Sequence, residues 1–200
     1  MRGADSRVFP GQALISNPQP FTTVLWDLDG TIIDSRAGIF NSFNHTLEAM
    51  GLPLLERADL NQYIGPPLLD SFIQLCGGDL SEAERAKAIY RERYLQGGGA
   101  LEADVFDGIL DVIEASKAAG MFNSLATSKG LSGVKIVGEH FDFLGLFDVL
   151  GTATNDGTRS TKADVITYAL AELELLDADL TRVVLVGDRI HDIEGAREHG

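Results

Sequence analysis

Apolar positions follow two different periods along this chain, and the change of period predicts two kinds of segment. Between residues 35 and 103, apolar residues recur at helical spacing and good strand signals are missing. Outside that stretch, short apolar runs bounded by turn residues predict buried strands. The four expected strands lie at residues 22–26, 121–126, 147–150 and 182–186.

Capping and turn residues set the expected ends of the first helices. Asp34 or Ser35 can cap a helix over residues 36–50, and Gly51 is a suitable stop for it. A second helix opens at the two prolines at positions 66–67.

Later helices carry similar signals. The capping-box pattern at residues 81–84 opens a third helix, which the glycines at 97–99 end. Ser160 or Thr161 caps a helix that runs to residue 173. The other expected helices cover residues 108–119, residues 132–140 and a segment that starts near Asp192.

The order of these elements predicts the fold class. Strands that alternate with helices after residue 104 indicate a parallel sheet with helices on both faces. We therefore expect an α/β protein, a doubly wound parallel sheet with an inserted all-helical cap. The core domain is expected at residues 21–34 and 104–200, and the cap domain at residues 35–103. Residues 1–20 are expected to form a flexible leader, because they lack the apolar core of a signal peptide.

Composition narrows the class of partner. The 200 residues contain 16 Lys and Arg against 30 Asp and Glu, which gives a formal net charge of -14. That charge argues against nucleic acid or an anionic membrane as a general partner, since both are polyanions. A small phosphorylated substrate is compatible with it, because a bound cation and a few local basic residues can reverse the field inside one pocket.

Cysteine usage and apolar run length bear on the compartment. Cys76 is the single cysteine, so an intrachain disulfide is excluded, and we expect it to be a core residue. No apolar run approaches the roughly 20 residues of a membrane span. The expected location is the cytoplasm.

The first strand ends in a pair of carboxylates, Asp27 and Asp29, followed by Gly30. Open α/β sheets bind their ligands outside the carboxyl ends of the strands, so both carboxylates should face one crevice. Such a pair repels itself unless a cation lies between the two groups or one of them stays protonated. Mg²⁺ fits the first case, and one carboxylate could then act as nucleophile and the other as general acid and base. An ordinary Asp-rich turn after a strand is the alternative.

Other strand ends supply further chemistry. Thr127 and Ser128 follow the second strand, Asp188 follows the last one, and Lys162 begins a helix in the same half of the chain. Each pattern alone is also typical of a turn or a solvated helix end. Together they provide hydroxyl donors, a cation and additional carboxylates, which is the set that phosphoryl transfer requires.

At this point the chain resembles the haloacid dehalogenase (HAD) superfamily, in the branch whose helical cap follows the first strand of a Rossmann-like core. The motif Asp27-Leu28-Asp29-Gly30-Thr31 carries the resemblance. Thr127, Lys162, Gly187-Asp188 and Asp192 follow it in the order and spacing of that superfamily.

A finer likeness points to phosphoglycolate phosphatase-like and 5'-nucleotidase-like members. It is carried by the segments 64–68, 126–129, 156–162 and 187–192. Relatives of this kind continue with at least one more strand, so the resemblance implies that a last strand is missing after Gly200 and that the 182–186 strand lies at an edge.

The resemblance also implies roles. Asp27 attacks phosphorus and forms an aspartyl phosphate, while Asp29 protonates the leaving oxygen and then activates water. Lys162 neutralises charge on Asp27 and the phosphate. The phosphate-binding residues that the resemblance implies are Gly30, Thr127, Ser128 and Lys162.

The same resemblance implies a Mg²⁺ site. Its ligands would be Asp27, the main-chain carbonyl of Asp29, and Asp188, with Asp192 behind them. His191 is not expected to be a ligand, because Mg²⁺ prefers oxygen.

The function expected from these residues is a Mg²⁺-dependent phosphatase of small phosphomonoesters, either phosphoglycolate-like or nucleoside monophosphates, that works through an aspartyl phosphate. One alternative is a phosphoryl transferase on the same site, either a sugar-phosphate mutase or a HAD-like protein tyrosine kinase. Another is a non-catalytic binding protein on the HAD fold. The expected partner is a small phosphorylated substrate rather than nucleic acid or membrane, and the oligomeric state stays open.

Overall fold

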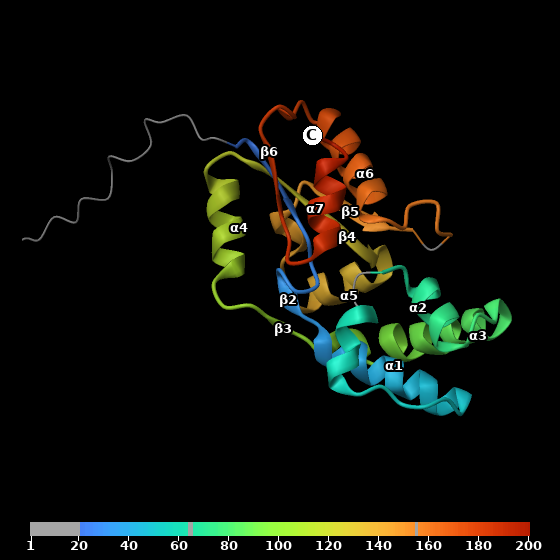
Figure 1. Cartoon of the computed structure of the whole chain (residues 1–200). Helices are drawn as coiled ribbons and strands as arrows, with labels where there is room; N and C mark the ends of the chain where they lie inside the picture. Colours follow the sequence, from blue (N-terminus) through green and yellow to red (C-terminus); the bar gives the residue numbers. More distant parts are fainter. Residues whose placement is uncertain (1–20, 64–65, 155) are drawn as a thin grey trace, which may run out of the picture.

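The computed structural model describes residues 21–63, 66–154 and 156–200, and a parallel sheet lies at its centre (Figure 1). Within these residues the sheet has four strands in the order β5-β4-β1-β6. They are β1 (Thr23–Trp26), β4 (Phe122–Gly130), β5 (Val149–Ala153) and β6 (Val183–Val186). The four expected strands and the α/β class are therefore confirmed. The expected leader lies outside the described residues.

The end of β4 differs from the sequence-based expectation. The strand was expected to end at Ala126, but it continues past Thr127 to Gly130, and its register against β5 shifts between those two residues. Residues 127–130 have the composition of a turn, but β5 still pairs with Thr127 and Gly130. Three polar residues, Thr127, Ser128 and Lys129, therefore belong to the last part of β4.

The two faces of the sheet belong to different apolar clusters, because successive strand residues point to opposite faces. Val24 and Trp26 of β1 pack in one cluster with Ile113 and Val134. Leu25, which lies between them, packs in the second. The helices on the two sides are α4 (Ile109–Ala118), α5 (Leu131–His140), α6 (Lys162–Glu174) and α7 (Ile190–Arg197).

Helix α6 begins at a defined residue because of its cap. The Thr161 hydroxyl accepts a hydrogen bond from the main-chain N–H of Asp164, and the Asp164 carboxylate accepts one from the N–H of Thr161. Of the two expected caps, the structure uses Thr161. Lys162 is thereby fixed as the first residue of the helix.

Helices and turns fill the described part of residues 36–101, which we call the helical insert (Figure 1). Two-residue strands, β2 (Ile33–Asp34) and β3 (Asp104–Val105), pair antiparallel where the chain enters and leaves the insert. They are too short to give a periodic signal in the sequence. The insert contains α1 (Arg36–Met50), η1 (Arg57–Tyr63), α2 (Leu68–Leu75), α3 (Leu80–Arg91), the π-helical turn η2 (Glu92–Gln96) and η3 (Gly99–Leu101).

The start of α3 corrects the sequence-based prediction. Asp79, not Ser81, occupies the cap position, and its carboxylate accepts a hydrogen bond from the N–H of Glu82. Both residues are good caps. Asp79 comes first in the chain and begins the helix at Leu80.

Burial differs from expectation at Cys76, which is half-buried beside the apolar cluster rather than inside it.

Strand β6 lies at one edge of the sheet formed by the described residues, and its residues are half-buried. Among the helices described, none has both the length and the apolar character needed to cross a membrane.

Candidate active site

The loop after β1 places two aspartates at the end of the central strand. Asp27 is only 6% exposed, and its N–H donates to the carbonyl of Val186 at 2.9 Å, so β1 and β6 stay paired up to the site. Gly30 follows with a φ of +97°, and a Cβ at this position would lie 2.4 Å from Oδ2 of Asp188. Glycine is required here for both the backbone angle and the close approach.

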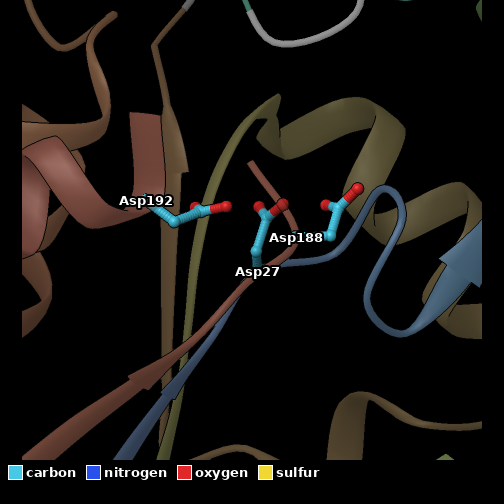
Figure 2. A group of neighbouring side chains, drawn as sticks. All are labelled: Asp27, Asp188 and Asp192. Atoms are coloured by element: carbon cyan, nitrogen blue, oxygen red, sulfur yellow. The ribbon is translucent and has the colours of Figure 1, made fainter. Parts of the chain in front are cut away.

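Three carboxylates meet beside this loop (Figure 2). Asp27, Asp188 and Asp192 each offer an oxygen, and these oxygens all lie within 4.8 Å of one another. Gly187 permits the arrangement, since a Cβ there would lie 2.3 Å from Cγ of Asp192. Hard oxygen donors in such a cluster fit Mg²⁺. The Asp29 side chain does not belong to this cluster in the described residues.

Lys162 brings a positive charge to two carboxylates of the cluster. Its ammonium lies 2.6 Å from Oδ1 of Asp27 and 2.7 Å from Oδ1 of Asp192, and it donates to the carbonyl of Ala126 at 2.7 Å. Burial raises the pKa of Asp27 to about 6, because Lys162 lowers the pKa by less than burial and Asp192 raise it. A cation among these carboxylates would restore the ionised form of Asp27.

The hydroxyl residues Thr127 and Ser128 lie near the end of β4, the strand that pairs with β1 beside Asp27. Thr127 is buried, and its Oγ1 accepts a hydrogen bond from the N–H of Lys129 at 3.1 Å. Thr127, Ser128, Asp27, Asp29 and Lys162 all line one cavity of about 460 Å³ between the sheet and the helical insert. That volume is typical of a small-molecule site.

Asp29 makes a contact that the sequence analysis did not predict. Its Oδ1 lies 2.9 Å from the ammonium of Lys129, which also donates to the hydroxyl of Tyr94 at 2.6 Å. Burial disfavours the charged lysine, but Asp29 and Tyr94 together raise the pKa of Lys129 above its ordinary value. The signal in the sequence was a lysine directly after Thr127 and Ser128, to which no role was given.

His191 and Arg189 also line the cavity without joining the carboxylate cluster as metal ligands. Arg189 pairs through Nε with Oδ2 of Asp188 at 3.1 Å. His191 lies 3.5 Å from the carboxylate of Glu194 and is largely exposed. Arg189 directly precedes α7 and His191 lies in its first turn, so the start of this helix forms part of the cavity wall.

Comparison with known proteins places this site in a family. The model of the haloacid dehalogenase-like hydrolases matches residues 24–200. The tyrosine-protein kinase PtkA of Mycobacterium tuberculosis is 38% identical over 177 residues, which are 88% of this chain and 59% of that protein. This chain therefore spans less than two thirds of the length of that relative.

Two other relatives are covered more completely. A 5'-nucleotidase of Pseudomonas aeruginosa is 37% identical over 90% of this chain and 80% of its own length. The crystal structure of a predicted phosphatase from Clostridium acetobutylicum superposes with a TM-score of 0.80, at 35% identity, over 89% of this chain and 81% of that one. Because the family match extends from β1 to the last described residue, this chain belongs to the haloacid dehalogenase-like hydrolases.

Proposed function

We propose that this protein is a Mg²⁺-dependent phosphatase that hydrolyses small phosphomonoesters, such as phosphoglycolate-like compounds or nucleoside monophosphates. The observation that carries the proposal is the setting of Asp27. It is buried at the end of β1, paired with Lys162, clustered with two other carboxylates, and followed two residues later by a second acid that lines the same cavity.

The reaction divides into two displacements. In the first, a carboxylate oxygen of Asp27 attacks phosphorus and the ester P–O bond breaks, while Asp29 gives its proton to the leaving oxygen. In the second, water attacks phosphorus and the bond between phosphorus and Asp27 breaks, which releases inorganic phosphate. Asp29 takes the proton of that water and returns to its starting form.

The remaining residues neutralise negative charge and orient the phosphoryl group. Lys162 donates a hydrogen bond to Oδ1 of Asp27 and neutralises negative charge as the phosphoryl group approaches. Thr127, with Ser128 beside it, would donate hydrogen bonds to the phosphoryl oxygens, because both residues line the same cavity as Asp27.

The carboxylates of Asp27 and Asp188 and the main-chain carbonyl of Asp29 would hold Mg²⁺, with Asp192 behind them. When bound, Mg²⁺ supplies charge neutralisation for the phosphate and the carboxylates. The oxygen cluster of Figure 2 supports this assignment, and two of its three residues are buried.

We extend the proposal to the organisation and setting of the chain. The core domain comprises residues 21–34 and 104–200, the cap domain residues 35–103, and the partner is a small phosphorylated molecule. The net charge of -14 disfavours nucleic acid. A single free cysteine suits a reducing compartment, which supports a cytoplasmic location.

A second candidate function is transfer of the phosphoryl group to a protein tyrosine. The similarity to the tyrosine-protein kinase of M. tuberculosis favours it. The same nucleophile and cation would serve, and the difference is whether water or a tyrosyl hydroxyl takes the phosphoryl group in the second displacement.

The test is a screen for phosphate release with Mg²⁺ present. The substrates are phosphoglycolate, nucleoside monophosphates, sugar phosphates and phosphotyrosine, and an isosteric Asp27→Asn variant reports background. Asp111→Asn, at an exposed position of α4, is the surface control. We expect wild type and D111N to release phosphate and D27N to release none. Transfer from ATP to a tyrosine peptide without release from any monoester would replace the proposal with the second candidate.

A further inference from the structure

A buried lysine joins the second aspartate of the motif to the helical insert. Lys129 leaves the end of β4 with a side chain that is only 7% exposed. Its ammonium lies 2.9 Å from Oδ1 of Asp29 on one side and donates to the Tyr94 hydroxyl at 2.6 Å on the other. One nitrogen therefore connects two regions of the molecule that are far apart in the sequence.

The geometry around Tyr94 holds its hydroxyl in place. The residue lies in η2, a π-helical turn that directly follows α3, and such turns recur at functional sites. Its ring stacks on Tyr90, with centroids 5.5 Å apart and planes 11° from parallel. Both rings are more than 90% buried. Because the ring is packed, the hydroxyl is a fixed acceptor for Lys129.

The aliphatic part of the Lys129 side chain, which we call its stem, is also packed. Gly133, in the first turn of α5, faces the stem, and a Cβ there would come within 3.2 Å of Cγ and Cδ of Lys129. Ordering a long side chain lowers its rotamer entropy. Because Gly133 and Tyr94 pack against Lys129, its side chain is already ordered in the folded protein, before any ligand binds.

We propose that Lys129 is a positioning residue for Asp29, and that Tyr94 of the helical insert completes this support. The inference rests on the proposed function, in which Asp29 is the acid and base. The Lys129 ammonium holds Oδ1 of Asp29 through the ion-pair contact at 2.9 Å. This contact fixes the rotamer of Asp29 and leaves Oδ2 as the oxygen that gives the proton to the leaving group and takes it from water.

A positioning role for Asp29 predicts a particular substrate pattern. Proton donation matters most for a poor leaving group such as an alkoxide, and least for an activated aryl oxide that departs without a proton. Loss of Lys129 should therefore resemble a weaker form of the loss of Asp29. A merely structural lysine would lower the rate on both kinds of substrate by the same factor.

The experiment compares phosphoglycolate with p-nitrophenyl phosphate in wild type, Asp29→Asn, Lys129→Met and the double variant. Misplacement of a catalytic group by about 1 Å can cost roughly 10²-fold. We expect Lys129→Met to lose about that factor in kcat on phosphoglycolate and less than about 5-fold on the aryl phosphate. The double variant should be no slower than Asp29→Asn alone, because coupled groups are non-additive.

Matched variants separate positioning from folding. Lys135→Met removes an exposed lysine of α5 and should leave both rates unchanged. Lys129→Arg keeps the charge and should recover part of the loss on phosphoglycolate. Tyr94→Phe keeps the packed ring and removes only the hydroxyl, so it should show the same substrate pattern with a smaller amplitude, even if Lys129→Met does not fold.

Two results would overturn the inference. One is an equal loss on both substrates in Lys129→Met and Tyr94→Phe, and the other is full additivity of Lys129→Met with Asp29→Asn. Failure of the proposed function itself has a different signature, because wild type would then hydrolyse neither substrate.

Discussion

Two lysine–aspartate pairs lie side by side in this site, and they are built differently. The Lys162 ammonium contacts three oxygens, one each from Asp27, Ala126 and Asp192, and all three residues belong to the sheet or to the loops and helices that follow its strands. Lys129 holds Asp29, but its second partner is Tyr94 of the helical insert. The first pair is complete within the core region, whereas the second needs the insert in place.

This difference separates the two halves of the proposed chemistry. The residue that receives the phosphoryl group, Asp27, is positioned within the core region, by pairing of its main chain with Val186 and by its contact with Lys162. The residue that handles protons is positioned jointly by sheet and insert. Variants on the two sides should therefore differ in how their effects depend on the leaving group.

The largest effect is expected from Asp27→Asn, which removes the nucleophile and keeps the shape. We expect turnover of every phosphomonoester to be abolished, because the amide lacks the anionic oxygen that attacks phosphorus in the first displacement. Steady-state phosphate release measures this, and circular dichroism checks the fold. A variant that retained a tenth of the wild-type rate would show that Asp27 is not the nucleophile.

Lys162→Met should come next. It removes the cation shared by Asp27 and Asp192, and loss of one such preorganised charge typically costs about 10²–10³-fold in kcat. Because Lys162 acts on the phosphoryl group and not on the leaving group, the loss should be equal on phosphoglycolate and p-nitrophenyl phosphate. Lys135→Met is the control. If Lys162→Met lowered the rate on phosphoglycolate alone, Lys162 would act on the leaving group, as Lys129 is proposed to do through Asp29.

Both pairs also show what the sequence could and could not predict. The strand ends and Lys162 follow from local patterns: short apolar runs that stop at Asp27 or Thr127, and a cap at Thr161 that begins α6. The pairing of Lys129 could not be predicted in this way. Its partner Tyr94 is 35 residues away in the sequence, in a helix whose tyrosines have the spacing of an ordinary apolar face.

Two smaller differences from the sequence-based predictions have causes of their own. Asp79 and Ser81 are both adequate caps, so the sequence does not choose between them. Pairing with β5 extends β4 past Ala126, a tertiary effect that strand propensity does not contain. We expect the choice of substrate to depend on the helical insert, especially on residues 65–68, of which position 65 lies outside the described residues.

Mg²⁺ binding gives a third comparison with a readout independent of activity. A ligand that binds only the folded state at about 100 times its Kd adds roughly 2.7 kcal/mol of stability. We expect Mg²⁺ to raise the Tm of wild type and of Asp29→Asn, because the Asp29 side chain lies outside the carboxylate cluster. Asp188→Asn should lose the shift, and excess chelator should reverse it. A shift that persisted in Asp188→Asn but vanished in Asp29→Asn would contradict the assignment in Figure 2.

The smallest effect concerns the support of Tyr94 by the residues around it. Arg93, its neighbour in η2, forms an ion pair with Glu102 and donates to the carbonyl of Gly97 at 2.8 Å. Burial raises the pKa of Glu102, but the hydrogen bonds from Arg93 and Asn41 outweigh it and hold that pKa below its usual value of 4.5. A lowered pKa means that the stabilisation is present above about pH 4.5 and is lost as the pH falls through the lower folded-state value.

Glu102→Gln keeps the size of the side chain and removes the charge. Because the pair is partly exposed, the cost at neutral pH should be at most about 1 kcal/mol. The difference in free energy of unfolding between wild type and Glu102→Gln should shrink as the pH is lowered from about 7 to about 3.5, a range that spans the usual glutamate pKa. Urea denaturation over that range measures it, and a difference independent of pH would show that packing, not the ion pair, is what Glu102 contributes. In the same variant a loss of about 2-fold on phosphoglycolate, with p-nitrophenyl phosphate unchanged, would extend the support of Asp29 from Tyr94 to the ion pair of Arg93 with Glu102.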